Sequence, residues 1–179
     1  MKARLAAVAL SLLAGWTSVR ADTLQQSYLG IYLAINDANR HEAEQDYLGA
    51  LVQYEAAKRV LARIQAKDPQ WESTLVTRRL GDCELKVAEL KPLAAFQLAK
   101  LNNEWSIDTA VIEGKDSWSA LERAQAKVTY MEVLQINHPE LAKAGMGEGV
   151  KEADKNVNEL IDALLAKSVE KPPAGGVVQ

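Results

Sequence analysis

The stretch 45–69 constrains the fold more than any other part of this 179-residue chain. Its apolar and small residues recur at alternating steps of three and four, at Tyr47, Ala50, Tyr54, Ala57, Leu61 and Ile64. That spacing places them on one face of an α-helix. Small side chains let a neighbouring helix come close, and Pro69 cannot continue the helix. The stretch therefore predicts a helix that packs against a partner helix and ends before Pro69.

Similar spacing predicts further helices along the chain. We expect a first helix over 24–44, a third from Trp71 to about Pro92, and a less regular fourth within 93–114. A fifth helix should begin with Asp116 or Ser117 as its N-cap and end before His138. A sixth should follow a glycine-containing loop at 145–149. With no strand pattern in the sequence, we predict an all-α fold of antiparallel hairpins with about five to six helices.

Residues 1–21 have the pattern of a secretory signal peptide. Lys2 and Arg4 precede an apolar run that reaches Trp16, and small residues end at Ala21. Because a membrane-spanning helix needs about twenty apolar residues, we expect cleavage and export by the Sec route to the periplasm or outside the cell, without stable membrane insertion. Retention of the segment as an anchor is the alternative. The remaining chain divides into a helical domain, 22–168, and a tail, 169–179, whose prolines and glycines favour disorder.

Charge and cysteine content argue against binding of nucleic acid and against an intrachain disulfide. Removing Lys2, Arg4 and Arg20 from the 21 basic residues leaves 18 against 24 acidic ones, a net charge of −6, so nucleic acid is not an expected partner. Cys83 has no second cysteine for an intrachain disulfide and is predicted to be buried.

Metal and catalytic sites have no clear pattern in the sequence. His41 and His138, almost a hundred residues apart, are predicted to face solvent and do not form a metal-ligand cluster. We expect no metal, no cofactor and no catalytic residue.

The chain contains an internal repeat at an offset of 70 residues. Aligned in this way, the prolines that stop two helices coincide without a gap, Pro69 with Pro139. Ala50-Leu51 also coincides with Ala120-Leu121. Two helical hairpins of about 34 residues each would span about 68, so the offset indicates a repeat of hairpins.

The first two predicted helices resemble a tetratricopeptide repeat (TPR) unit, as found in exported bacterial TPR-like proteins. The matching positions are Ala38, Tyr47, Ala50, Tyr54 and Ala57, with Pro69 as the stop. Val60, Leu61 and Ile64 add roughly two turns before that proline, so this would be a lengthened variant. The resemblance implies a groove that binds a protein segment, lined on the first helix by Tyr32, Ile35, Asn36 and Asn39.

Two further features have both a binding and a structural interpretation. Arg78 and Arg79 could hold an acidic partner, or could form surface pairs with Glu72, Asp82 or Glu84. Trp71, Trp105 and Trp118 are predicted to pack at helix ends, with Trp105 and Trp118 as an exposed anchor in the alternative.

Together these patterns predict a non-catalytic scaffold for protein–protein interaction whose partner is another protein or peptide segment. The alternative function is structural. The same steps of three and four would suit a coiled-coil or helical-bundle element of the cell envelope that associates with copies of itself.

Overall fold

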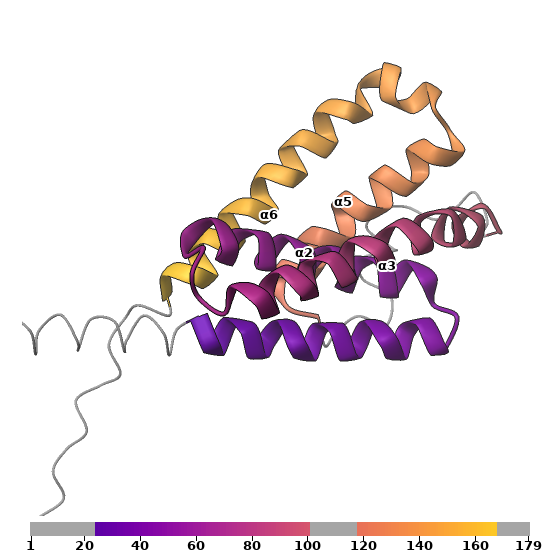
Figure 1. Cartoon of the computed structure of the whole chain (residues 1–179). Coiled ribbons are helices and arrows are strands. Elements are labelled where there is room, and N and C mark those ends of the chain that lie inside the picture. Colours follow the sequence, from indigo (N-terminus) through magenta and orange to yellow (C-terminus); the bar gives the residue numbers. More distant parts are fainter. Residues whose placement is uncertain (1–23, 101–117, 168–179) are drawn as a thin grey trace, which may run out of the picture.

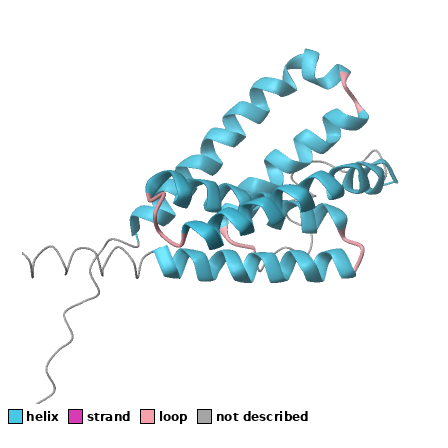
Figure 2. Ribbon diagram, in the orientation of Figure 1, coloured by secondary structure: helices cyan, strands magenta, loops and turns pink. Residues whose placement is uncertain are grey.

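The computed structural model describes residues 24–100 and 118–167, and within these ranges it consists of helices joined by short turns (Figures 1 and 2). The elements are a first helix at 24–43, α2 (Tyr47–Lys67), α3 (Ser73–Lys100), α5 (Ala120–Asn137), the π-helical turn η1 (Ala142–Met146) and α6 (Gly147–Lys167). The prediction of an all-α helical array is confirmed. The predicted signal peptide, most of the predicted fourth helix, Trp105 and the predicted tail lie outside the described residues. No helix in the described part is long and apolar enough to cross a membrane.

The central helix is α2, which is packed on more than one side. The first helix, α2 and α3 run up and down beside one another (Figure 1). The predicted apolar face of α2 is buried, with Ala50, Leu51 and Leu61 inaccessible to solvent. Every residue from Gly49 to Ala57 is buried as well, including the polar Gln53 and Glu55. These polar residues are buried because α5 packs on the side of α2 opposite the core that α2 forms with the first helix and α3.

The start of α2 is a tight corner. Asp46 is the N-cap, and its Oδ1 accepts a hydrogen bond from the Gly49 amide at 3.0 Å. The Asp46 Oδ2 atom lies 2.8 Å from His41 Nδ1. His41 is only 8% exposed, and its ring meets Trp118 edge-on with 6.5 Å between centroids. The prediction that His41 faces solvent is therefore wrong, because Asp46 at the start of α2 and Trp118 just before α5 cover the end of the first helix.

The third helix does not stop at Pro92. It continues to Lys100, so residues 93–100 belong to α3 and do not start a separate helix as predicted. Proline lacks the amide that would bond the carbonyl four residues earlier. Pro92 lies on the exposed side of α3, where water can reach that carbonyl, while Leu90, Ala94 and Leu98 anchor the opposite side in the core.

In the C-terminal half, α5 ends before His138 as predicted, but two other predicted boundaries need correction. The N-cap of α5 is Ser119, which forms a capping box with Glu122, and it is neither Asp116 nor Ser117. The expected loop at 145–149 is mostly helical. Gly147 and Gly149 belong to α6, and only Gly145, with φ of 101°, has a backbone conformation that favours glycine.

The segments related by the 70-residue offset are two helical hairpins, α2–α3 and α5–α6. Helix α5 contacts both α2 and α3, and its last residue, Asn137, bonds Ala95 of α3, whereas α6 diverges from α2 toward the turn of the hairpin (Figure 1). Trp118 is 8% exposed in a small cluster with Val52 and Ala126, so the alternative of an exposed Trp118 anchor is wrong. Trp71 packs edge-on against Tyr28 of the first helix, with centroids 5.9 Å apart.

Candidate binding groove

A groove of about 280 Å³ opens between the first helix and the open end of the α5–α6 hairpin. Its floor is α2, through Gln53, Ala56, Ala57 and Val60. One wall is the first helix, and the other is the start of α5 with Leu164 of α6. Four helices, from both halves of the described chain, therefore build one depression.

Small residues on the groove surface would allow the backbone of a bound segment to come close. Gly30 and Ala34 line the first-helix wall, and Ala56 and Ala57 line the floor. Larger apolar side chains stand at its edges, where Leu33 is 56% exposed and Leu164 is 40% exposed. Small residues in a helical surface allow close approach of a further helix. The groove thus offers an apolar trough with leucines along its edges.

The polar end of the groove is formed by Gln53 and Glu122. Gln53 is 1% exposed, and its Nε2 donates a hydrogen bond of 2.8 Å to Glu122 Oε1. Glu122 Oε2 accepts from the Ser119 amide at 2.5 Å. Within the described part of the chain, Gln53 Oε1 is buried and has no hydrogen-bond partner. Asp37 of the first helix lines the same groove, so the ionisable side chains among the described lining residues, Asp37 and Glu122, are both acidic.

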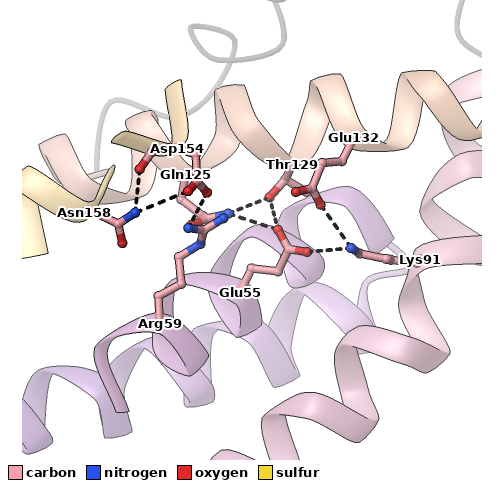
Figure 3. A network of polar contacts seen from close by, with 8 residues as sticks. All are labelled: Glu55, Arg59, Lys91, Gln125, Thr129, Glu132, Asp154 and Asn158. Carbon is pink, nitrogen blue, oxygen red and sulfur yellow. Dashed lines mark hydrogen bonds and ion pairs between the residues drawn. The ribbon is translucent and has the colours of Figure 1, made fainter. Parts of the chain in front are cut away.

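Next to the groove, a buried polar network joins α2, α3 and α5 (Figure 3). Glu55 is 3% exposed and its Oε2 accepts from Thr129 Oγ1 at 2.5 Å and from Gln125 Nε2 at 2.9 Å. Its Oε1 lies 3.3 Å from Lys91 Nζ. Lys91 also pairs with Glu132 at 3.0 Å. The carboxylate of Glu55 is therefore committed to contacts within the fold.

The charge state of Lys91 is set by this network. Burial disfavours its charged form, but Glu55 and Glu132 outweigh that effect and hold the Lys91 pKa above its ordinary value. A second set of pairs fixes α6 against α2, with Arg59 at 2.5 Å from Asp154 and Arg63 bound by Asp162. These contacts hold the wall of the groove in place.

The binding residues proposed from the sequence lie elsewhere on the surface. On the first helix, residues 27, 30, 34 and 37 lie on the groove side of the buried stripe, whereas 32, 36 and 39 lie on its other side. Tyr32 is 48% exposed, Asn36 is exposed and Ile35 packs partly against the core. Asn39 accepts a 2.6 Å hydrogen bond from the Tyr54 hydroxyl. None of these four lines the groove.

Arg78 and Arg79 also lie outside the groove, on α3. Arg78 is exposed, and Arg79 lies 3.9 Å from Asp82, one of the surface pairs considered above.

The residues of the TPR resemblance occupy packing positions. Ala38, Ala50, Tyr54 and Ala57 are all buried in the main core. Tyr47 is partly buried against the same core, and Pro69 lies in the exposed turn after α2. Gln53 and Glu122 were not identified from the sequence. The internal repeat could have pointed to them, because Gln53 on α2 and Glu122 on α5 are 69 positions apart, close to the 70-residue offset.

A second, more open depression of about 510 Å³ lies between α5 and α6. Its lining mixes lysine and glutamate side chains, including Lys127, Lys155, Glu152 and Glu159. Because both charge signs are present, it has no clear preference for one ligand charge. Among residues 24–100 and 118–167, no group of histidine, cysteine and acidic side chains is arranged to hold a metal ion.

Comparison of the chain with protein-family models, with curated proteins and with solved structures gives no match. The fold class therefore rests on the helices themselves.

Proposed function

We propose that this protein is a non-catalytic interaction scaffold that binds a segment of another protein in the groove over α2. The observation that carries the proposal is a mainly apolar trough, floored by Ala56, Ala57 and Val60 with Gln53, and open between the first helix and the α5–α6 hairpin. Peptide recognition by a helical groove depends on apolar anchors that enter such a trough. The TPR resemblance of residues 24–69 and the signal-like segment 1–21 favour a scaffold that acts in the periplasm or outside the cell.

Several contacts support a pre-formed groove. Arg59 and Arg63 bind Asp154 and Asp162, which holds α6 along α2. Ser119 and Glu122 cap α5 at the groove edge. A pre-organised surface loses less conformational entropy on binding than a mobile one. The exposed fractions of Leu33 and Leu164 leave apolar area for a partner to cover.

A blocking variant tests the proposal directly. Gly30 lines the groove, and a side-chain carbon added there meets no atom within 4 Å, so Gly30→Leu should fold while its side chain occupies the trough. Peptides would be selected from a displayed random library on the purified protein, and their affinity measured by fluorescence anisotropy. We expect Gly30→Leu to weaken the selected peptides by about tenfold or more, equivalent to about 1.4 kcal/mol.

Gly81→Leu is the matched control. Gly81 is a helical glycine of α3 with equally open surroundings, and it is outside the groove. Circular dichroism should show that both variants are folded, and only Gly30→Leu should lose peptide affinity. Equal binding by the two variants would place the binding surface elsewhere, and a library that enriches no peptide would contradict the scaffold function.

The same purified protein separates the scaffold from the self-association alternative. Light scattering of a scaffold with a free groove should give the mass of a monomer. A stable higher oligomer that Gly30→Leu dissociates would mean that copies of the chain fill the groove.

A further inference from the structure

We propose that the groove selects a basic amphipathic helix, with apolar side chains held in the trough and a lysine or arginine bound at its polar end by Glu122, Gln53 and Asp37. This inference rests on the proposed function and specifies the chemistry of the partner.

The first argument is charge. Asp37 and Glu122 line the groove, and no lysine, arginine or histidine is among its described lining residues. Asp37 bonds Arg40 at 3.2 Å, but both side chains are more than half exposed, and an exposed pair one turn apart contributes little. Each oxygen of Glu122 accepts one hydrogen bond and retains a further lone pair. An incoming cation therefore finds two carboxylates.

The second argument is the amide of Gln53. Its Nε2 donates to Glu122, whereas its buried Oε1 has no partner among the described residues. Buried acceptors are almost always satisfied, because leaving one unpaired is destabilising. A lysine or arginine head is a multiple donor, so one such group could bond the carboxylate of Glu122 and, once a rotation of the Gln53 side chain brings its buried oxygen to the groove, Gln53 Oε1 as well.

The third argument is the size and shape of the groove. Ligand pockets commonly have volumes of about 300–1,000 Å³, so a trough of about 280 Å³ accommodates a few side chains. A helix presents side chains three and four positions apart on one face, which suits a trough that runs between helices. The small side chains of Gly30, Ala34 and Ala56 allow its backbone to approach.

Two other occupants fit less well. A second copy of this chain has a net charge of −3, and its acidic surface would be repelled by Asp37 and Glu122. An acidic peptide could be attracted by the first turn of α5, where helix dipoles favour anions. However, two donors there are already occupied, since the Glu122 amide bonds Ser119 Oγ and the Ser119 amide bonds Glu122 Oε2.

Three synthetic peptides of about 18 residues, long enough to form helix, test this chemistry. The first has a leucine stripe flanked by lysines, the second replaces the lysines by glutamates, and the third keeps the lysines but replaces the leucines by serines. Affinity for the purified protein is measured by fluorescence anisotropy. We expect the first peptide to bind at least about tenfold more tightly than either of the others. Its affinity should fall with rising salt, because salt screens the contribution of the lysines.

Variants then locate the selective groups. Glu122→Gln removes the charge but keeps one side-chain oxygen, which can serve the capping box. Asp37→Asn is the second single variant. Each of the two variants should lower the affinity for the lysine peptide by about threefold to fivefold, the effect of one partly exposed ion pair. Glu89→Gln is the control, because Glu89 is an exposed carboxylate of α3 outside the groove, and it should leave the affinity unchanged.

Gln53→Leu tests the unpaired acceptor. We expect weaker binding of the lysine peptide with little change of stability in urea, since the substitution removes an unsatisfied buried oxygen along with the hydrogen bond to Glu122. Reduced stability with unchanged affinity would show that Gln53 only supports the fold.

The inference and the proposed function fail in different ways. If the lysine and glutamate peptides bind equally, and Gly30→Leu weakens both, the groove is a binding site without charge selection and the inference is overturned. If no designed or selected peptide is sensitive to Gly30→Leu, the function and the inference both fail. Tighter binding of the glutamate peptide would assign the groove to acidic partners.

Discussion

At the scale of single residues, Glu55 explains how α2, α3 and α5 keep one arrangement. Its carboxylate is buried but receives two hydrogen bonds from α5 and one ion pair from α3. A buried charge is costly unless it is paired and hydrogen-bonded. A shift of α5 along α2 would break these bonds without supplying others. Glu55 therefore disfavours alternative packings of the hairpin.

Removing the cation from this network should destabilise the fold. Lys91→Met leaves the Glu55 carboxylate buried without its ion pair. We expect a loss of about 2 kcal/mol in the free energy of unfolding, below the roughly 3–5 kcal/mol of fully buried pairs because Lys91 is partly exposed. Urea unfolding followed by circular dichroism measures it. Lys151→Met is the control, since Lys151 pairs with Glu148 in solvent, and its change should stay within experimental error.

A double variant separates the ion pair from simple packing loss. Glu55→Gln with Lys91→Met removes both charges, so its cost should be smaller than the sum of the single costs. Additive losses would contradict direct coupling between Glu55 and Lys91.

Gly49 provides a second prediction at this scale. A side-chain carbon there would lie 2.3 Å from Asp46 Oδ2 and 2.9 Å from His41 Nδ1. Gly49→Ala should displace the N-cap of α2 and lower the free energy of unfolding by about 1–2 kcal/mol. Gly81→Ala, in open space on α3, should instead raise it by about 0.5–1 kcal/mol. Urea unfolding measures both variants, and a shift of the two unfolding midpoints in the same direction would contradict this prediction.

At the scale of elements, α3 shows how tertiary packing prevails over a local stop signal. Leu90, Ala94 and Leu98 are buried on one side of the helix, and Pro92 is exposed on the other. Burial of the flanking residues offsets the lost backbone hydrogen bond at Pro92.

Pro92→Ala should therefore stabilise α3. The substitution restores an amide that can bond the Ala88 carbonyl, and we expect a gain of about 1–3 kcal/mol in the free energy of unfolding. Thermal and urea unfolding measure the gain. If the variant is less stable, the proline has a role in aligning residues 93–100 with the core.

The helices could be predicted from local spacing, but the groove could not. Steps of three and four identify the buried stripe of the first helix and of α2, and Pro69 correctly marks the end of α2. The same spacing gives Gln53 and Glu55 an exposed position, because nothing local indicates that α5 will cover them. Which side of the first helix borders a groove depends on where α5 and α6 cross α2. Those crossings are set by contacts between residues about 70 to 100 positions apart, which local spacing does not reveal.

At the scale of the whole molecule, two hairpins share one core but are joined by polar contacts that are distant in sequence. Arg59 with Asp154 connects α2 to α6, and Asn137 Nδ2 donates to the Ala95 carbonyl at 2.9 Å. The main core also spans both hairpins, since Val128, Val157 and Ile161 belong to it. We therefore expect the described helices to unfold as one cooperative unit.

This shared core should make the whole molecule sensitive to alkali. Burial raises the pKa of the Cys83 thiol to about 11 from 9.0, and burial, with Glu42 nearby, raises the pKa of Tyr54 to about 12 from 10.0. Both groups hold their protons more tightly in the folded state than in the unfolded state. Their contribution to stability is complete below pH of about 9 and is lost as the pH rises towards about 12.

Each group should contribute on the order of 2 kcal/mol to that loss. The urea midpoint should therefore fall steadily between pH of about 9 and 12, in a single transition by every probe. Lys91 contributes in the same direction because its pKa is also raised, so a variant is needed to isolate the thiol. Cys83→Val keeps an apolar side chain at this buried position and removes the titrating group. Its midpoint should fall less steeply with pH than that of the unsubstituted protein, and an identical slope would show that Cys83 does not couple ionisation to folding.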